Sequence, residues 1–176
     1  FGREIGLLYV HAHIRYIEAM AKIGENERLY EGLNMICPIL IKDSVSNALT
    51  RQGNVYFSSS DGDFYNRYEA NESFNKLKTK EVNVKAGWRL YSSGPGIYLH
   101  QLYSKFFGIN VLNDGLYLDP ILSKNVNNTK IEFTYNNKHI TINYHVLTDK
   151  STISEVKVND KLFTNSNTDT YRNSGL

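Results

Sequence analysis

A chain of 176 residues, of which 41% are hydrophobic and 22% charged, can bury a core, so its composition excludes a disordered polypeptide. Twenty basic and eighteen acidic side chains leave a formal charge of +2, which excludes the strong positive field that holds nucleic acid or an anionic membrane. The single cysteine excludes an internal disulfide and a zinc site made of several cysteines, and it agrees with a cytoplasmic location. Any anion-binding site must therefore be local.

Both ends of the chain resemble cuts within a longer protein. The start at Phe1 has neither an initiator methionine nor the layout of a secretory signal, and residues 165–176 are polar. No stretch approaches the roughly eighteen consecutive apolar residues of a membrane helix. We expect a piece of a larger protein with no membrane contact.

The first third of the chain predicts two antiparallel helices. Apolar residues recur every three or four positions between Leu7 and Gly24, and Gly24 is a typical helix stop. A second helix is predicted from Asn26, acting as its cap, to Pro38. The short connection makes the two helices neighbours, which is the repeating unit of bundles and of barrels built from helix pairs.

The middle of the chain predicts a long ordered loop and then a third helix. Periodicity fades from Ile39 to Arg89, where aromatic residues flank a run of small polar ones. A helix is predicted from about Pro95 to Phe107, with Gly108 as its stop and Ser93 or Gly94 as its cap.

The last third predicts β-strands because apolar residues alternate with polar ones. The turn Asn136-Asn137 joins two of these runs, since Asn tolerates a positive φ. The fold class is therefore α+β, with an antiparallel sheet in a sandwich-like arrangement after the helices. The alternating apolar positions are Ile109 and Val111; Leu116 and Leu118; Ile131, Phe133 and Tyr135; Ile140, Ile142, Tyr144 and Val146; and Val156 and Val158.

Two segments could bind an anion. His11 and Arg15 are four residues apart on one helix face and could grip a phosphate together, but the spacing alone favours a solvated face with an Arg15–Glu18 ion pair. His13 lies on another side and is predicted to pack. The glycine-rich helix start at residues 92–96 offers backbone N–H groups and the helix dipole, although a serine there more often only caps the helix.

Other chemistry has weaker support in the sequence. Asp61 and Asp63 lie in a turn, where carboxylates usually accept hydrogen bonds from their own backbone. A phosphate-binding Walker loop and a serine nucleophile elbow are both missing from the sequence. Thirteen tyrosines provide flat faces with polar tips that suit sugars, although composition alone favours ordinary packing.

Several motifs together resemble the C-terminal part of the inverting glycoside phosphorylases of glycoside hydrolase family 94. They are Tyr9-Val10-His11 at a helix start, Trp88 to Tyr98 around Ser-Gly-Pro-Gly, Gly108-Ile109, and Gly115-Leu116-Tyr117-Leu118-Asp119-Pro120. The chain looks most similar to the 1,2-β-oligoglucan phosphorylases, often labelled cellobiose phosphorylase. The resemblance implies that residues 1–107 are the last helices of an (α/α)₆ catalytic barrel and that residues 108–176 are an incomplete C-terminal β-domain.

The resemblance also implies a reaction. Phosphate attacks the anomeric carbon of a β-glucan while one Asp protonates the leaving oxygen, giving α-glucose 1-phosphate without any cofactor. One carboxylate suffices because phosphate is already an anionic nucleophile and only needs to be held in line. That Asp belongs to a segment before Phe1, so no catalytic residue is expected in this chain, and the chain alone should be inactive.

The phosphate ligands implied by the resemblance are His11 and the pair Ser93-Gly94, with arginines from the rest of the barrel. Ser93 stands where several relatives have Thr, and Pro-Gly follows, so the hydroxyl remains while the neighbouring backbone changes. Arg51, Gln52 and Tyr56 resemble the stretch that lines the acceptor-sugar side of the cleft, and loop scaffolding explains them equally well. A homodimer is a further expectation.

Three alternatives stay open. The chain could be the phosphorylase-like end of a cyclic β-1,2-glucan synthase, within a membrane protein. Residues 108–176 could be a non-catalytic carbohydrate-binding module. They could also only buttress the barrel or form a dimer interface.

Overall fold

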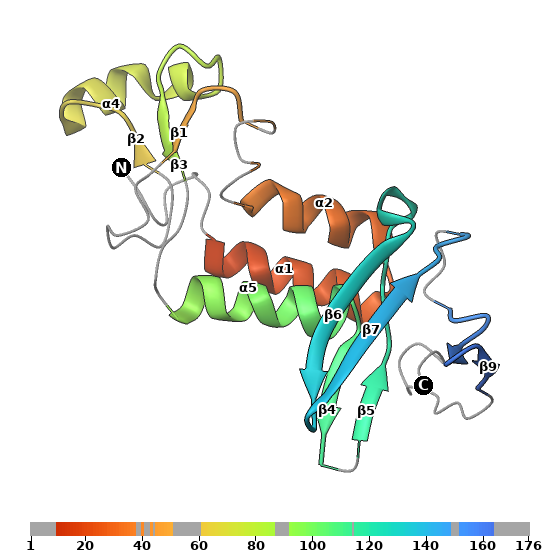
Figure 1. Cartoon of the computed structure of the whole chain (residues 1–176). Coiled ribbons are helices and arrows are strands. Elements are labelled where there is room, and N and C mark those ends of the chain that lie inside the picture. Colours follow the sequence, from red (N-terminus) through yellow and green to blue (C-terminus); the bar gives the residue numbers. More distant parts are fainter. Residues whose placement is uncertain are drawn as a thin grey trace. The chain divides into compact units, whose positions relative to one another are not determined.

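The computed structural model describes residues 10–37, 40, 43, 45–50, 61–86, 92–113, 115–148 and 152–163. Within them helices alternate with small sheets, so the predicted α+β class is confirmed (Figure 1). The chain divides into two compact units, which are described in turn. The first consists of Phe1–Ala19 and Glu31–Leu102, and the second of Met20–Tyr30 and Tyr103–Leu176.

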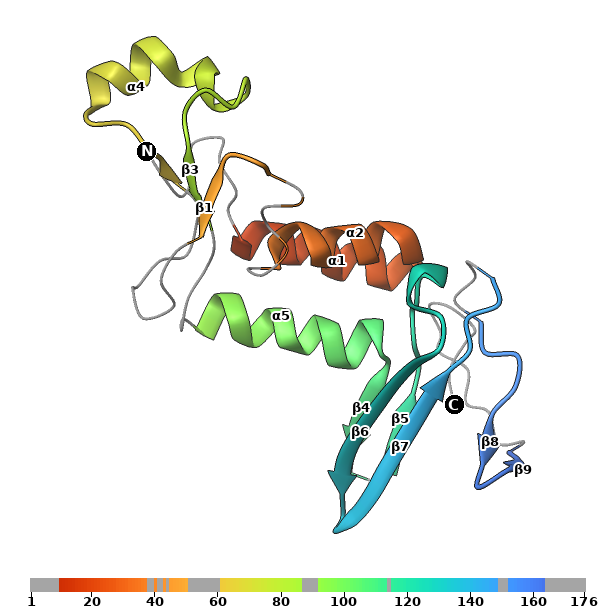
Figure 2. The same ribbon diagram turned by 45° about the horizontal axis from the view of Figure 1, so that its top comes forward.

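Three helices lie side by side, each with part of its length in the first unit (Figures 1 and 2). The first two confirm the predicted pair, and Gly24 ends α1 with a φ of +74°. Ile14 and Ile17 of α1 are fully buried, and Gly32 of α2 lets the two backbones approach, because a Cβ atom there would lie 3.0 Å from Cγ1 of Ile17. The helices are α1 (Val10–Ile23), α2 (Asn26–Ile36) and the continuous segment of η2 (Ser92–Gly96), α5 (Ile97–His100) and η3 (Gln101–Phe106).

The middle of the chain forms a small folded element, so the prediction of one long loop is wrong over residues 61–86. A three-stranded sheet has the order β1-β3-β2, with β1 parallel and β2 antiparallel to β3. Its core is Ala48, Leu77 and Val84. Strands of two or three residues show no readable alternation, and α4 buries only Ala70, so neither has a periodic signal. The elements are β1 (Ala48–Thr50), β2 (Asp61–Gly62), α4 (Arg67–Ser73), η1 (Phe74–Leu77) and β3 (Val84–Ala86).

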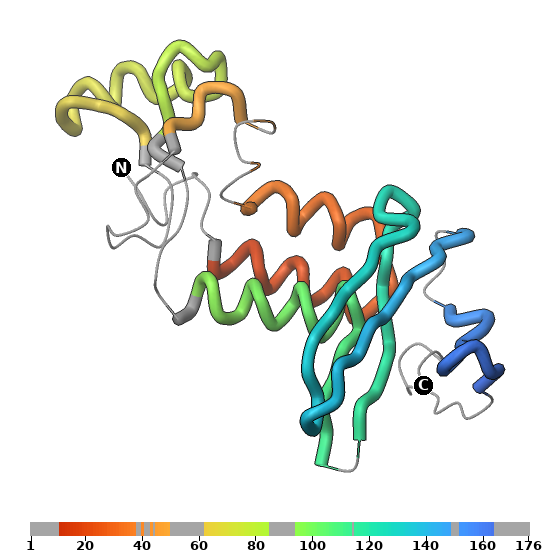
Figure 3. Tube along the Cα trace, viewed as in Figure 1, coloured from red at the N-terminus to blue at the C-terminus, as the bar shows by residue number. Residues whose placement is uncertain are grey.

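The second unit contains the predicted strands, paired as three antiparallel hairpins that follow one another along the chain (Figure 3). Asn136 and Asn137 have φ of 48° and 58°, which confirms the predicted turn. Over the described residues the hairpins do not join into the single antiparallel sheet that the sequence predicted. Alternation predicts which residues form strands, but it does not predict which strands pair. The hairpins are β4 (Ile109–Leu112) with β5 (Gly115–Leu118), β6 (Thr129–Tyr135) with β7 (Lys138–Tyr144), and β8 (Lys157–Val158) with β9 (Lys161–Leu162); η4 (Lys124–Val126) precedes β6.

Aromatic rings connect the end of the third helix with the β6–β7 hairpin inside the second unit. The ring of Phe107 lies 5.2 Å from that of Phe106 and 6.1 Å from that of Tyr144. The Tyr144 hydroxyl donates a 2.7 Å hydrogen bond to the carbonyl of Phe107. The phenol thereby satisfies a carbonyl near the helix end, which the helix itself leaves without a partner.

Asn26 has a different role from the one predicted. The first hydrogen bond of α2 runs from the N–H of Leu29 to the carbonyl of Glu25, so the helix begins one residue earlier than a cap at Asn26 requires. The buried Asn26 side chain donates to the carbonyl of Leu122 at 2.8 Å. It therefore ties the start of α2 to the chain that follows β5.

Gly108 ends the third helical segment, as predicted, with a φ of +67°. Its carbonyl accepts a 2.8 Å hydrogen bond from the N–H of Asp119, and the N–H of Ile121 donates to the carbonyl of Phe106 at 3.0 Å. A Cβ atom on Gly108 would overlap the backbone of Asp119 and Pro120. Among the described helices, none has the length and apolarity to cross a membrane.

Candidate functional site

The two predicted anion-binding segments start neighbouring helices of the first unit. α1 and α5 run in the same direction with their N-terminal ends on the same side (Figures 1 and 2). His11 is the second residue of α1 and is half-buried, while Gly94 lies in η2 and is buried. We call His11 and residues 92–96 the helix-start site.

The helical segment begins earlier than predicted, so Ser93 and Gly94 are not caps. Helical geometry starts at Ser92, and both residues lie within the first turn. A first turn leaves its N–H groups without partners inside the helix, and Pro95 has no N–H to offer. The N–H groups of residues 92–94 are therefore the ones that the helix itself does not use. The side chain of Ser93 lies outside the described part of the chain.

Two neighbours of His11 have structural partners, as the alternatives for them predicted. His13 Nε2 lies 2.9 Å from the carbonyl oxygen of Gly32, so His13 is the expected packing histidine between α1 and α2. Arg15 donates to Glu18 at 2.8 Å in an exposed ion pair. Because Arg15 pairs with Glu18, it does not join His11 in binding an anion. The exposed ion pair adds little stability, because water screens it.

Tyr98 joins α5 to α2 and was not singled out from the sequence. Its hydroxyl donates to the carbonyl of Leu33 at 3.4 Å. Burial first, and then the charge and hydrogen bond of Cys37, raise the pKa of the phenol well above its ordinary value. Tyr98 therefore stays neutral at physiological pH and acts as a hydrogen-bond donor that positions α5.

Gln101 is a second polar residue that sequence reasoning missed. The residue is only 3% exposed, and its Oε1 accepts no hydrogen bond in the described structure. It lies at the first residue of the π-helical turn η3. The sequence did not single out Gln101, because apolar periodicity predicts a regular α-helix and does not reveal a π-helical turn.

Three predicted sugar contacts, Arg51, Gln52 and Tyr56, lie outside the described residues. Asp63 is exposed, and its N–H donates to the carbonyl of Asn83 at 2.9 Å beside the small sheet. In the described part of the chain no three His, Cys, Asp or Glu side chains gather as a metal site would require.

Comparison with known proteins bears on most of the chain. Residues 108–176 match the family model described as the glycoside phosphorylase C-terminal domain. The chain is related to the glycoside phosphorylases. It is 50% identical over 144 residues to the 1,2-beta-oligoglucan phosphorylase of Listeria innocua serovar 6a, an alignment that covers 82% of this chain. The aligned part spans 13% of that relative's length. The resemblance inferred from the motifs is confirmed.

The structure explains why two of the motifs that carry the resemblance to phosphorylases occur together in this chain. Gly108 and the Asp119-Pro120 step are eleven residues apart in sequence, yet their backbones touch. The two backbones can approach this closely only because Gly108 has no side chain. These motif residues therefore join the end of the third helix to the first hairpin.

Proposed function

We propose that this chain is part of an inverting glycoside phosphorylase that cleaves β-1,2-glucan with inorganic phosphate and releases α-glucose 1-phosphate. The observation that carries this proposal is the 50% identity, over most of the chain, to a 1,2-beta-oligoglucan phosphorylase. The paired helix starts support it, because both offer groups that bind phosphate. The reaction makes the whole enzyme a glycosyltransferase-type phosphorylase of glycoside hydrolase family 94.

We assign residues 1–107 to the end of an (α/α)₆ catalytic barrel and residues 108–176 to a C-terminal β-domain. The antiparallel hairpin of α1 and α2 is the repeating unit of such a barrel. The family match supports the division, since it begins at residue 108. The remaining barrel helices would come from the rest of the protein, which acts in the cytoplasm as a homodimer.

The helix-start site would hold phosphate through three kinds of group. His11 donates from one ring nitrogen, Ser93 donates its hydroxyl, and the N–H groups of residues 92–94 point along a helix dipole that favours an anion. A phosphate oxygen bonds to the anomeric carbon as the bond to the departing glycosidic oxygen breaks. A general acid elsewhere in the protein protonates that oxygen, so phosphate is consumed as a substrate and no cofactor takes part.

Arg51, Gln52 and Tyr56 are proposed to contact the acceptor sugar. Their side chains combine a cation, an amide and an aromatic ring, which together supply donors, acceptors and a flat face for a sugar. A sugar that departs from this side must carry the proton from the general acid.

The function is tested by incubating the full-length protein with β-1,2-glucan, with and without inorganic phosphate. We expect glucose 1-phosphate to accumulate only when phosphate is present, because phosphate is the nucleophile. Release of free glucose at the same rate in both reactions would show hydrolysis and overturn the proposal.

The phosphate site is tested by His11→Ala in the full-length protein. We expect the KM for phosphate to rise at least about tenfold, as the loss of one hydrogen bond to a charged group implies. Arg15→Ala is the matched control, because Arg15 is one turn away and pairs with Glu18. Equal effects of the two substitutions would remove His11 from the site.

A further inference from the structure

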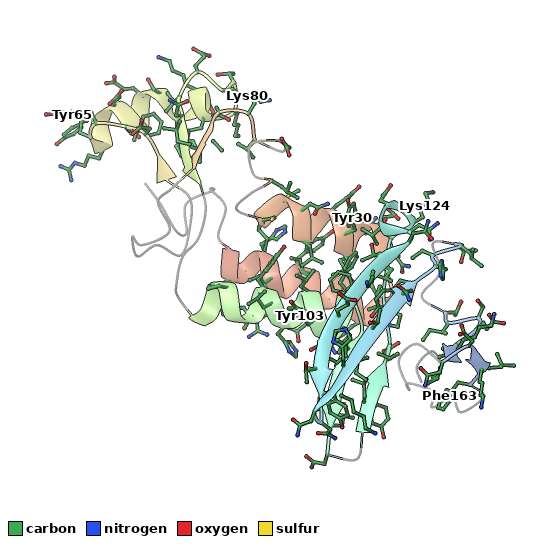
Figure 4. The ribbon with its side chains drawn as sticks, viewed as in Figure 1. Tyr30, Tyr65, Lys80, Tyr103, Lys124 and Phe163 are labelled. Atoms are coloured by element: carbon green, nitrogen blue, oxygen red, sulfur yellow. The ribbon has the colours of Figure 1, made fainter. Side chains whose placement is uncertain are left out.

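Two tyrosines are unusually exposed where the chain enters α4. Tyr65 is 94% exposed and Tyr68 is 65% exposed. Figure 4 shows Tyr65 at the N-terminal end of α4, pointing away from the helix. Isolated apolar residues on a surface are common, but here two large, exposed aromatic rings lie within four consecutive residues at the start of one helix.

Hydrogen bonds hold the backbone that carries both rings. Oδ1 of Asn66 accepts from the N–H of Tyr68 at 2.9 Å and from that of Glu69 at 3.0 Å, which caps the helix. The carboxylate of Glu69 accepts from the N–H of Tyr65 at 2.7 Å. Hydrogen bonds therefore tie the turn to the first helical residues, which lowers the entropy that a ligand would have to remove on binding.

The Tyr68 ring is held as well. The guanidinium of Arg67 lies 4.8 Å from the ring centre, and its Nη2 donates to the Tyr68 hydroxyl at 2.8 Å. Since these contacts lie at the surface, they do not contribute to a core. Their effect is to fix the direction of an exposed ring and to place a cation with further N–H donors beside it.

We propose that Tyr65, Tyr68 and Arg67 form a binding surface for the glucan chain, called the α4 tyrosine surface, which adds to the binding by the helix-start site. The proposal rests on the proposed function and names one more contact for the same substrate. The C–H groups on a sugar ring carry partial positive charge and pack against the negative face of an aromatic ring. The hydroxyls of the sugar meet the tyrosine tips and the guanidinium.

The surroundings favour a sugar over a protein partner. The other exposed residues of α4 are polar or charged, and its only buried residue is Ala70. A protein interface would need a contiguous apolar centre, which this face does not offer. A neutral polyhydroxyl chain needs flat rings interspersed with donors and acceptors, and that is the composition of the α4 tyrosine surface.

The test compares two pairs of substitutions in the full-length protein. Tyr65→Ala with Tyr68→Ala removes both rings, while Tyr65→Phe with Tyr68→Phe keeps their faces. With a long linear β-1,2-glucan as the probe, we expect the alanine pair to raise KM about tenfold and the phenylalanine pair about twofold. With a β-1,2-linked glucose trisaccharide we expect a smaller effect, because a short chain reaches fewer contacts. Tyr103→Ala, a half-exposed tyrosine of the second unit, is the control.

The outcomes separate this proposal from the proposed function. An alanine pair that leaves the KM for long glucan unchanged overturns the α4 tyrosine surface, whether or not the melting temperature falls. A fall in melting temperature with unchanged KM would mean that another part of the protein covers the rings. If the wild-type protein shows no phosphorolysis, calorimetric binding of the same long glucan without phosphate tests the surface alone. Equal binding by wild type and the alanine pair then overturns it.

Discussion

Gly108 occupies a position where the backbone of Asp119 and Pro120 leaves no room for a side chain. We expect Gly108→Ala to destabilise the protein by about 3 kcal/mol or more, because it combines a positive φ with a clash against rigid backbone. The measurement is the free energy of unfolding in urea. Gly96→Ala is the control, since Gly96 has an ordinary helical φ of −63° and open space around it. A variant of Gly108 as stable as that of Gly96 would contradict the packing described.

The buried phenol of Tyr144 should make the free energy of unfolding depend on pH. Burial raises the pKa of the Tyr144 phenol, whereas a tyrosine in an unfolded chain ionises at about pH 10. Above that pH the unfolded chain holds fewer protons than the folded one, so the free energy of unfolding falls as pH rises. The stabilising contribution is complete below about pH 10 and is lost as the pH rises toward the pKa of the folded state.

Tyr144→Phe isolates this contribution. At neutral pH we expect the variant to be about 1 kcal/mol less stable, because it loses the hydrogen bond to the Phe107 carbonyl. Above about pH 10 the difference should shrink, since phenylalanine has no proton to lose. Urea unfolding at several pH values measures both effects. A constant difference across the pH range would show that Tyr144 ionises normally in the folded protein.

Single residues also show where prediction from sequence succeeds. The packing role of His13 and the Arg15–Glu18 pair followed from helical spacing, because spacing alone decides which side chains share a helix face. The burial of Gln101 and the raised pKa of Tyr98 did not follow, because each depends on partners distant in the sequence. The roles of His11 and Ser93 stay predictions.

At the scale of elements, the close packing of α1 and α2 depends on Gly32. We expect Gly32→Val to destabilise the protein by about 2 kcal/mol, because its methyl groups would push into the fully buried Ile17. Gly32→Ala should change stability little, since the better helix propensity of alanine offsets a shift of a few tenths of an ångström. Melting temperatures of the two variants provide the comparison. A valine variant that melts with the alanine variant would contradict this packing.

Elements differed in how well the sequence predicted them. The long helices and the β6–β7 hairpin have repeated periods and turn residues that require positive φ, so their bounds were predicted closely. The small sheet around β3 pairs distant short strands, and such pairing has no local signal. The third helix begins earlier than predicted, at Ser92, in a π-helical turn made of Ser, Gly and Pro, and the propensities of these residues predict a cap or a turn rather than helix.

At the scale of the whole molecule, sequence reasoning identified the family, since its motifs are local and specific. The (α/α)₆ barrel could not be identified in the same way, because a barrel is defined by the complete ring of its helices. The chain spans 13% of the length of its phosphorylase relative. The proposed activity therefore belongs to the complete protein, and the catalytic acid is expected in the part that this chain does not include.

The central claim is inverting transfer of glucose to phosphate. The most direct measurement is proton NMR of the first product formed from β-1,2-glucan in phosphate buffer, with the full-length protein and with residues 1–176 alone. We expect α-glucose 1-phosphate from the full-length protein and no product from the shorter chain. The β anomer, free glucose, or activity of the 176-residue chain alone would contradict it.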